Sequence, residues 1–357
     1  MNATIASKLS VFVIHGKEFP VSCCAPTSKA ASKNETAGRV CPADYHISRD
    51  AFAGNPEYSC DVLYVVGGLY GNPFALDAVE GLVDGEKTRA AFEGKAVPRV
   101  LAVFNGDMHW FDKTAENFAS IEKAAAKYTL LIGNVEAELR RESPIGVGCG
   151  CAYPACVDNE TVARSNKIHS MLFNELFDRP ELKELLQGRP STTTVAVAGR
   201  KVGITHGDEH MVGGWNCSRE ELSKLERQQK LDAFLVENDL DVLATTHTCS
   251  AAAIALDHGL VINNGAAGLP NFAGQHFGLV IRIAETPHPD ALFGAQRNGL
   301  FVEAVPVRYD HDSYVKWFDE LWPEGSPAEI SYRGRIVSGP ADYVEEALLG
   351  GFQQLKR

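Results

Sequence analysis

The sequence predicts an α/β fold in which two β-sheets pack against each other. Short apolar runs in the first half alternate with helical patterns, as expected of a layered α/β sheet. The runs are Asp61–Val66, Val100–Phe104 and Tyr128–Ile132, with helices expected from Phe74 onward and over Thr114–Lys127. In the second half, tight turns at Gly199-Arg200-Lys201 and Asp257-His258-Gly259 join the strands instead. These hairpins indicate a second sheet that packs on the first.

Composition indicates an ordinary globular protein. The chain has 357 residues, 45% of them hydrophobic and 22% charged, which is enough for one large or two modest cores. The net charge of −12 argues against nucleic acid or an anionic membrane surface as the main partner. No apolar run reaches the roughly 18 residues that a membrane helix needs. The amino end has no long apolar core typical of a signal peptide, so the cytoplasm is the expected location. The oligomeric state is left open, a homo-oligomer included.

The chain divides into three expected parts. Residues 1–60 form an amino-terminal extension with one strand at Ser10–Ile14 and a loop-rich, cysteine-containing stretch. This extension is expected to pack on the main domain; the alternative is an active-site cover that carries reactive thiols. Residues 61–300 form the main domain, and residues 301–357 add a strand, Phe301–Val307, and two helices.

The first strand of the main domain runs into a glycine-rich turn, Gly67-Gly68-Leu69-Tyr70-Gly71-Asn72. A helix with apolar spacing begins directly after Pro73. Backbone N–H groups in a strand-to-helix turn of this kind can cradle a phosphate group. By itself this turn is a weak signal of phosphate binding.

An insert at residues 143–159 carries three cysteines: Cys149, Cys151 and Cys156. They can bind Zn²⁺ with a fourth ligand such as Cys217, or they can be free thiols, and the spacing does not separate the two interpretations. The whole chain has nine cysteines, an odd number in a chain that is not small. A disulfide scaffold is therefore not expected, and thiols or metal ligands are favoured.

The pattern after the insert predicts further helices and strands in order. Helices are expected at Glu160–Phe177 and Glu181–Gln187, and a long one at Arg219–Glu237. The predicted strands are Thr194–Ala198, Val202–Thr205, Val242–Thr246, Leu260–Asn263 and Gly278–Ala284.

Four of these strands end at a residue type that binds metals. Asp107 follows the Val100–Phe104 strand, and Asn134 follows Tyr128–Ile132. His206 and His247 follow the strands that end at Thr205 and Thr246. Because ligands bind at the carboxyl ends of strands in open α/β sheets, these four side chains predict a metal site.

The order of these motifs resembles the calcineurin-like metallophosphoesterase superfamily. That family has five blocks: Asp-x-His, Gly-Asp, Gly-Asn-His/Asp, a His before Gly, and Gly-His-x-His. Gly106-Asp107, Gly133-Asn134 and His206-Gly207 look like the second, third and fourth blocks, and Thr246-His247-Thr248-Cys249 looks like the fifth. The resemblance spans about residues 61–284 and implies a four-layer α/β/β/α sandwich with two packed mixed β-sheets.

The first block departs from the family pattern. Gly68 and Tyr70 stand where the family has the Asp and His that hold the first metal ion, and Cys249 stands in place of the last His. Val135 replaces the His with which many members protonate the leaving group. The second-metal set, Asp107, Asn134, His206 and His247, is complete. The resemblance therefore implies one divalent transition metal ion, Mn²⁺, Fe²⁺ or Zn²⁺, and leaves a second ion open.

The resemblance also implies roles for individual residues. Asp107 would bridge two cations, and Asp107 and Asn134 are the first catalytic candidates. Cys249, as a thiolate, is a candidate substitute ligand for a second ion, or else a small buried residue that fills the vacated site. His109 and His210 are further catalytic candidates and substitute ligands, or else polar loop residues near the site. Candidate contacts to the substrate phosphate are Tyr70, Asn72, Arg140, Arg141 and Arg164.

The expected function is hydrolysis of a small phosphorylated metabolite by a metal-activated water. The alternative is a non-catalytic or regulatory binding protein on a metallophosphoesterase scaffold, suggested by Gly68, Tyr70 and Val135. A third hypothesis is a thiol-sensitive site shaped by the cysteines. We also expect the Cys249 sulfur to lie beside His247 at the metal centre, because residues two apart in an extended chain point to the same side.

Overall fold

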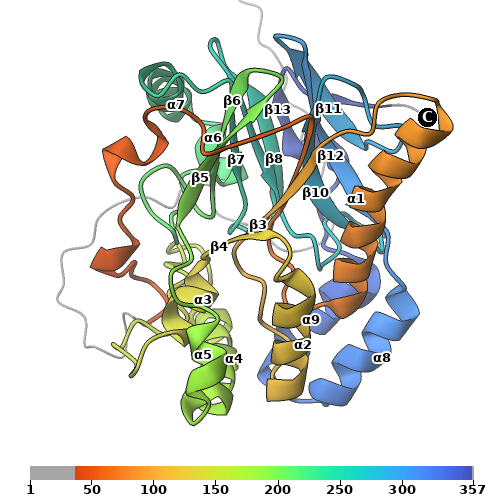
Figure 1. Ribbon diagram of the computed structural model, residues 1–357. Coiled ribbons are helices and arrows are strands. Elements are labelled where there is room, and N and C mark those ends of the chain that lie inside the picture. Colours follow the sequence, from red (N-terminus) through yellow and green to blue (C-terminus); the bar gives the residue numbers. More distant parts are fainter. Residues whose placement is uncertain (1–36, 356–357) are drawn as a thin grey trace, which may run out of the picture.

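Residues 37–355, which the computed structural model describes, form two seven-stranded β-sheets with helices on their outer faces (Figure 1). We call them the β3 sheet and the β7 sheet. In order across the β3 sheet the strands are β14 (Gln353–Gln354), β11 (Phe293–Arg297), β12 (Leu300–Val307), β10 (Gly278–Ala284), β2 (Val62–Val66), β3 (Val100–Asn105) and β4 (Thr129–Leu131). Across the β7 sheet they are β1 (Tyr58–Cys60), β5 (Thr192–Val197), β6 (Arg200–Thr205), β7 (Val242–Thr245), β9 (Leu260–Asn264), β8 (Ala251–Ala255) and β13 (Leu348–Gly350).

Both sheets are mixed. Strands β2, β3 and β4 run parallel to one another, as do β6, β7 and β9. The hairpins β5–β6 and β8–β9 and the pairs that β10 makes with β2 and β12 are antiparallel. The parallel strands therefore present their carboxyl ends together, where the sequence places its candidate ligands.

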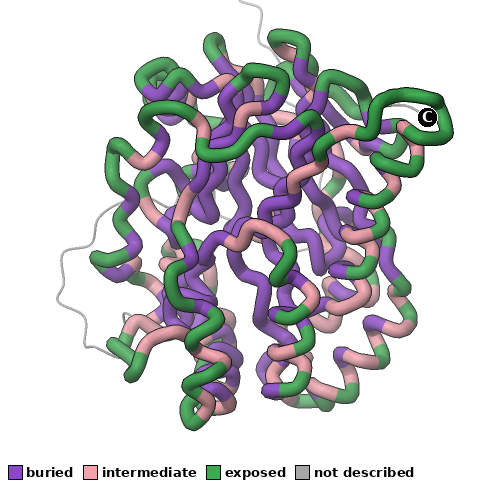
Figure 2. Tube along the Cα trace, in the orientation of Figure 1, coloured by how far each residue is buried: buried purple, intermediate pink, exposed green. Residues whose placement is uncertain are grey.

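Three apolar layers make the molecule a four-layer sandwich, which confirms the expected fold. The two sheets bury a layer between them that includes Leu63 and Val65 of β2. Tyr64 and Val66 of the same strand point the other way, into the layer under the helices of the β3 sheet. Because both faces of β2 are covered, its sequence is continuously apolar. Figure 2 shows the strands as the buried interior of the molecule.

Helices cover the two outer faces. On the β3 sheet lie α1 (Pro73–Phe92), α2 (Ala115–Ala125), α4 (Asn159–Phe177), α8 (His311–Leu321) and α9 (Pro327–Ser338). On the β7 sheet lie α6 (Arg219–Leu222) and α7 (Leu225–Glu237), together with the short helices Ala43–Tyr45 and Arg49–Phe52. The remaining helices are α3 (Asn134–Leu139), α5 (Pro180–Glu184) and the short helix Val344–Ala347. In the described part of the chain, no helix is both long and apolar enough to span a bilayer.

The single helix expected over Arg219–Glu237 is wrong. The chain leaves the helical conformation at Lys224, so α6 and α7 are separate helices. The hydroxyl of Ser223 donates a hydrogen bond to the carbonyl of Glu220, and Lys224 pairs with Glu221. Local bonds of this kind compete with helix continuation, which an apolar period does not reveal.

The described residues near both ends of the chain contribute strands to the sheets. Tyr58–Cys60 pairs with β5, and Leu300–Val307 lies between β10 and β11. Apolar side chains at Tyr45, Ile47 and Phe52 are buried against the β7 sheet. The strand expected at Ser10–Ile14, with Cys23 and Cys24, lies outside the described residues.

Candidate metal centre

Four side chains from the two sheets converge at the strand ends. Asp107 follows β3, Asn134 begins α3 after β4, and His206 and His247 follow β6 and β7. The Nε2 atom of His206 lies 3.3 Å from Asp107 Oδ1, 3.2 Å from Asn134 Oδ1 and 3.2 Å from His247 Nδ1. All four residues are buried. We refer to them as the ligand cluster, and it is the set that the sequence predicts.

The ring hydrogens of the two histidines point away from the cluster. His206 Nδ1 lies 2.7 Å from the carbonyl oxygen of Asn105, and His247 Nε2 lies 3.1 Å from that of Cys151. A carbonyl only accepts, so these two nitrogens are the donors. In the neutral rings the lone pairs of His206 Nε2 and His247 Nδ1 therefore face each other. Carbonyl partners of this kind orient metal-binding histidines.

This arrangement fits a divalent cation. Two nitrogen lone pairs at 3.2 Å repel unless a cation or a proton lies between them. The spacing of the atoms agrees with a tetrahedral site, in which ligands about 2.0–2.1 Å from the ion lie roughly 3.4 Å apart. Among the described residues, the acidic, histidine and cysteine side chains that gather within 4.8 Å are Asp107, His206 and His247.

The protonation states of Asp107 and His247 suit metal binding. Burial lowers the pKa of His206, but the Asp107 carboxylate outweighs it and the net pKa is raised, so an ion would take the place of the proton on His206 Nε2. Burial raises the pKa of Asp107, but His206 outweighs that effect and the net pKa is lowered. Burial and the neighbouring His206 lower the pKa of His247 to about 4. Asp107 is therefore a carboxylate and His247 a neutral imidazole at neutral pH, the forms in which these side chains bind a metal.

Backbone strain is concentrated around the cluster. Tyr70, Asp107, His247 and Cys249 have φ angles of 55°, 51°, 65° and 57°, in the left-handed region that side chains other than glycine seldom adopt. All four line one cavity. Such strain costs about 1–3 kcal/mol per residue and gathers at functional sites. It supports a functional role for this cavity independently of the ligand types.

Glu136, which the sequence analysis did not identify, holds the loop that carries Asp107. Its Oε2 accepts hydrogen bonds from the backbone N–H groups of Asp107 and Gly133, at 2.9 and 3.0 Å. Its Oε1 accepts from Met108 and His109, at 2.8 and 3.2 Å. The signal was present in the sequence, because Glu three residues after a helix cap reaches back to the cap.

The cluster opens into a cavity of about 230 Å³. Its wall contains five aromatic side chains, which we call the aromatic wall: Tyr70, Trp110, Tyr153, Trp215 and Tyr332. Val135 lines the cavity near the ligands, so no histidine stands there to protonate a leaving group. Apart from Tyr70, the members of the aromatic wall could not be recognised from the sequence, because they come from separate segments of the chain.

Tyr70 and Cys249 occupy the half of the site that departs from the family pattern. The Tyr70 hydroxyl lies 2.7 Å from the Cys249 sulfur. A Cβ atom at Gly68 would lie 2.9 Å from the Tyr70 ring, so the glycine and the tyrosine fit each other. Cys249 lines the cavity together with His247 but is not one of the gathered ligand atoms. The extended geometry from which we expected this position is wrong, because both residues have positive φ.

His109 does not belong to the site. Its ring nitrogens lie 2.6 Å from Asp112 and 2.7 Å from Glu122, and the side chain is fully buried. Burial lowers the pKa of His109, but the Asp112 and Glu122 carboxylates outweigh the effect of burial and raise this pKa to about 10. A protonated imidazole with both nitrogens engaged has no lone pair for a metal. The ligand and catalytic roles expected of His109 are therefore wrong.

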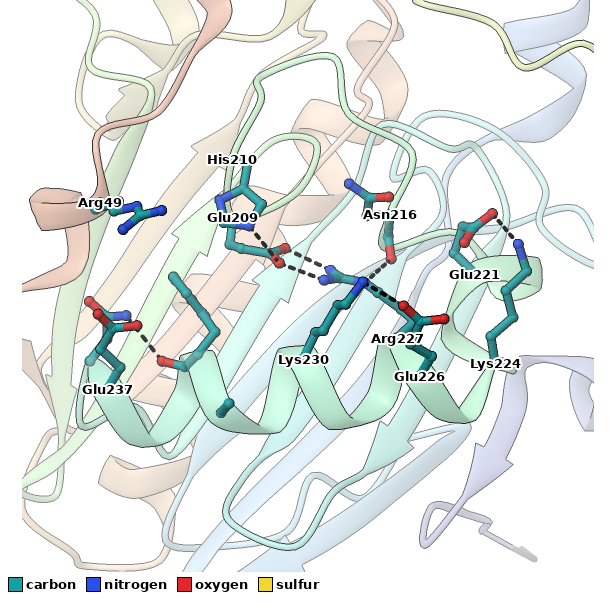
Figure 3. A pocket seen from close by; sticks show the side chains of 13 residues that line it. Arg49, Glu209, His210, Asn216, Glu221, Lys224, Glu226, Arg227, Lys230 and Glu237 are labelled. Carbon is teal, nitrogen blue, oxygen red and sulfur yellow. Dashed lines mark hydrogen bonds and ion pairs between the residues drawn. The ribbon is translucent and has the colours of Figure 1, made fainter. Parts of the chain in front are cut away.

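His210 lies in a different place, at an open groove of about 720 Å³ beside α7 (Figure 3). Its Nε2 is 3.4 Å from Glu209. Two basic side chains of this groove are paired, with Arg227 bound to Glu209 and Lys230 bound to Glu226 (Figure 3). His210 does not line the cavity of the ligand cluster, so its expected role at the metal centre is also wrong.

Asn72 and the three arginines, which were expected to contact the substrate phosphate, lie away from the lining of the cavity in the described part of the chain. The Asn72 side chain caps α1 by accepting from Ala75 N–H and donates to the Gly268 carbonyl. Arg141 pairs with Glu138 and Asp44, and Arg164 donates to Ser331 and Thr161. Within residues 37–355, neither Asn72 nor Arg140, Arg141 or Arg164 lines the cavity.

The cysteines of the insert do not form a zinc site with Cys217. Cys149 and Cys151 are joined in a disulfide, and Cys217 is buried beside Arg227. The expectation of free thiols or metal ligands is therefore wrong for Cys149 and Cys151. The pair touches the ligand cluster, since Asn134 Nδ2 donates to the Cys149 carbonyl at 3.0 Å. The insert thus orients Asn134 as well as His247.

Comparisons with known proteins agree with the fold. No family model and no curated protein matches the chain. A hypothetical protein from Pyrococcus horikoshii superposes with a TM-score of 0.51 and 13% identity, over 80% of this chain and 100% of that one. A metallophosphoesterase from Sphaerobacter thermophilus superposes with a TM-score of 0.47 and 14% identity, over 78% of this chain and 100% of that one. A predicted phosphoesterase from Streptococcus pneumoniae superposes with a TM-score of 0.34 and 13% identity, over 70% of this chain and 91% of that one. At these identities the first of the three shows a shared fold and nothing finer.

Proposed function

We propose that this protein is a metal-dependent phosphoesterase that acts on a small phosphorylated metabolite. The observation that carries the proposal is the ligand cluster, in which lone pairs of two oriented histidines face each other beside a carboxylate and an amide oxygen. Nitrogen and oxygen ligands of this kind suit Mn²⁺, Fe²⁺ or Zn²⁺. When bound, such an ion polarises a phosphoryl oxygen and acidifies a water molecule.

The residues of the chain supply position and shelter. Glu136 fixes the Asp107 loop, and the Asn105 and Cys151 carbonyls fix the two imidazoles. Burial raises the pKa of Tyr70 well above its ordinary value, so its phenol stays neutral and remains a hydrogen-bond donor. The aromatic wall keeps bulk water away from the reacting group, which strengthens electrostatic interactions inside the cavity.

The test measures metal content and hydrolysis together. Protein purified without chelator should contain close to one transition metal ion per chain and should hydrolyse some member of a panel of phosphate esters when Mn²⁺ is added. Asp107→Asn and His247→Gln should each lower both values at least tenfold. His288→Gln, at a buried histidine in the loop between β10 and β11, serves as the control and should change neither. Metal-free protein that cleaves no ester would refute the proposal.

One observation favours a second candidate, a non-catalytic binding protein on the same scaffold. The Tyr70 ring lies against Gly68, where the family pattern has first-metal ligands, and Val135 removes the usual acid. Under this alternative the protein binds its metal ion through the ligand cluster and cleaves no ester. Hydrolysis that disappears in Asp107→Asn would exclude it.

A further inference from the structure

The cavity beside the ligand cluster presents ring faces rather than polar groups. The indole N–H of Trp215 donates to the Cys151 carbonyl at 2.8 Å, and the Tyr153 hydroxyl binds Ser165 at 3.0 Å. The polar ends of both side chains are thus already hydrogen-bonded within the protein. The Trp215 ring lies 5.4 Å from the His247 ring and 5.9 Å from the Tyr153 ring. The Trp215 ring stands at 74° to the His247 ring and at 47° to the Tyr153 ring, so aromatic side chains in different orientations begin directly beside a ligand residue. Planar aromatic groups stack on such side chains or pack edge to face against them.

The charge of the cavity is low. Among the described residues that line it, Asp107 is the charged one, and neither lysine nor arginine is present. A divalent ion beside the Asp107 carboxylate leaves a single net positive charge. A phosphomonoester carries close to two negative charges at neutral pH because its second pKa is about 6, whereas a phosphodiester carries one. A buried charge without a partner is costly, so the cavity matches the diester.

Apart from the ligand residues, the described side chains that line the cavity include no imidazole or carboxyl group that could protonate a leaving oxygen. Val135 stands near the ligands, and the lining hydroxyls belong to threonine, serine and tyrosine side chains. Hydroxyl groups are weak acids, with a pKa of about 10 even for a phenol, while an effective general acid has a pKa near the working pH. A leaving group that departs as an anion is therefore favoured. Aromatic alcohols, with a pKa of about 10, depart in this way far more readily than alkyl alcohols.

We propose that the substrate is a singly charged phosphodiester whose leaving group is a planar aromatic alcohol. This inference rests on the proposed function and names the class of substrate for the same site. In the reaction, a bond forms between the water oxygen and phosphorus, and the bond between phosphorus and the aromatic oxygen breaks. The water proton passes to solvent, and the products are a phosphomonoester and the aromatic oxide.

The first experiment compares three esters on the metal-loaded full chain. Ethyl p-nitrophenyl phosphate is the matching diester, p-nitrophenyl phosphate is a monoester with the same leaving group, and diethyl phosphate is a diester without an aromatic group. We expect kcat/KM for the aromatic diester to exceed both others at least tenfold. Faster cleavage of the monoester than of the aromatic diester would overturn the inference while leaving phosphoesterase activity in place.

The second experiment isolates the aromatic ring of Trp215. Trp215→Ala and Trp215→Phe both lose the hydrogen bond to Cys151, but Trp215→Phe keeps a ring. Because stacking on one aromatic side chain changes affinity roughly tenfold, KM for the aromatic diester should rise about tenfold in Trp215→Ala and less than threefold in Trp215→Phe. Equal KM values in the two variants, each checked for folding by circular dichroism, would contradict stacking on this ring.

Binding without hydrolysis separates this inference from the proposed function. Methyl phenylphosphonate is singly charged and aromatic, and its phenyl group is attached through a carbon–phosphorus bond. It should bind the metal-loaded protein at least tenfold more tightly than methyl methylphosphonate, as measured by calorimetry. That preference in a protein that cleaves no ester would refute the enzymatic proposal and retain the ligand class. The absence of the preference in an active enzyme would refute the ligand class alone.

Discussion

His109 shows how a residue beside the ligand cluster can serve the fold instead of the chemistry. It lies between the carboxylates of Asp112 and Glu122, and Glu122 also pairs with Arg189. These side chains are almost completely buried, so each charge depends on its partners for compensation. The ion pairs tie the loop after β3 to α2. They hold in place the segment that carries Asp107.

This role predicts a stability effect with a defined pH dependence. His109→Gln leaves the buried Asp112 carboxylate without its cation and Glu122 with Arg189 alone, and should lower the free energy of unfolding by roughly 3–5 kcal/mol at pH 6. The folded-state pKa of about 10 lies above the ordinary value of 6.5, so the stabilisation is complete below pH 6.5 and is lost as the pH rises through about 10. Urea unfolding from pH 6 to 10 should show the difference between wild type and variant shrinking. His276→Gln, at an exposed histidine, is the control, and a pH-independent difference would contradict the role of the charge.

At the scale of elements, the turn after β2 has been rebuilt around Tyr70. Gly68, with a φ of 65°, passes close to the Tyr70 ring, and the ring's hydroxyl contacts Cys249 on the turn after β7. The two turns therefore form one unit, in which Tyr70 and Cys249 contact each other where the family pattern has ligands for a first metal ion. Substitution of one of these three residues leaves the other two in place.

The turn predicts how metal content responds to substitution. Cys249→His alone should leave the number of bound ions unchanged, because Tyr70 still fills the space and Gly68 supplies no carboxylate. The triple variant Gly68→Asp, Tyr70→His, Cys249→His should bind a second ion, since it supplies a carboxylate and two imidazoles beside Asp107. Elemental analysis after dialysis against Mn²⁺ measures both. A second ion in Cys249→His alone would show that the turn does not exclude it.

A feature could be predicted from the sequence when it depends on residues that are close together along the chain. Strands such as Val100–Asn105 are covered on both faces, so the local pattern alone reveals them and the ligands at their ends. The ion-pair network of His109 could not be predicted, because Glu122 meets His109, and Arg189 meets Glu122, only in the folded chain. The aromatic wall was invisible for the same reason, since Trp110, Tyr153 and Trp215 come from separate loops. Short edge strands such as β13 and β14 have too few residues to show a period.

At the scale of the whole molecule, the ligand cluster joins the two sheets. Asp107 and Asn134 follow strands of the β3 sheet, whereas His206 and His247 follow strands of the β7 sheet. Elsewhere the sheets meet largely through the apolar layer between them, which has no directional contacts. An ion held by both sheets therefore adds a specific link across the middle of the sandwich. Its removal should affect the stability of the whole fold.

This link predicts that a chelator lowers the melting temperature of the entire protein. A ligand present at one hundred times its dissociation constant stabilises the folded state by about 2.7 kcal/mol, which corresponds to several degrees for a domain of this size. Calorimetry should therefore show a lower melting temperature after treatment with EDTA and full recovery when Zn²⁺ or Mn²⁺ is restored. In His247→Gln, which removes one ligand of the β7 sheet, EDTA should have no effect. If the chelator lowered the melting temperature of this variant as much as that of the wild type, the stabilising ion would lie outside the ligand cluster, and the link between the sheets would be refuted.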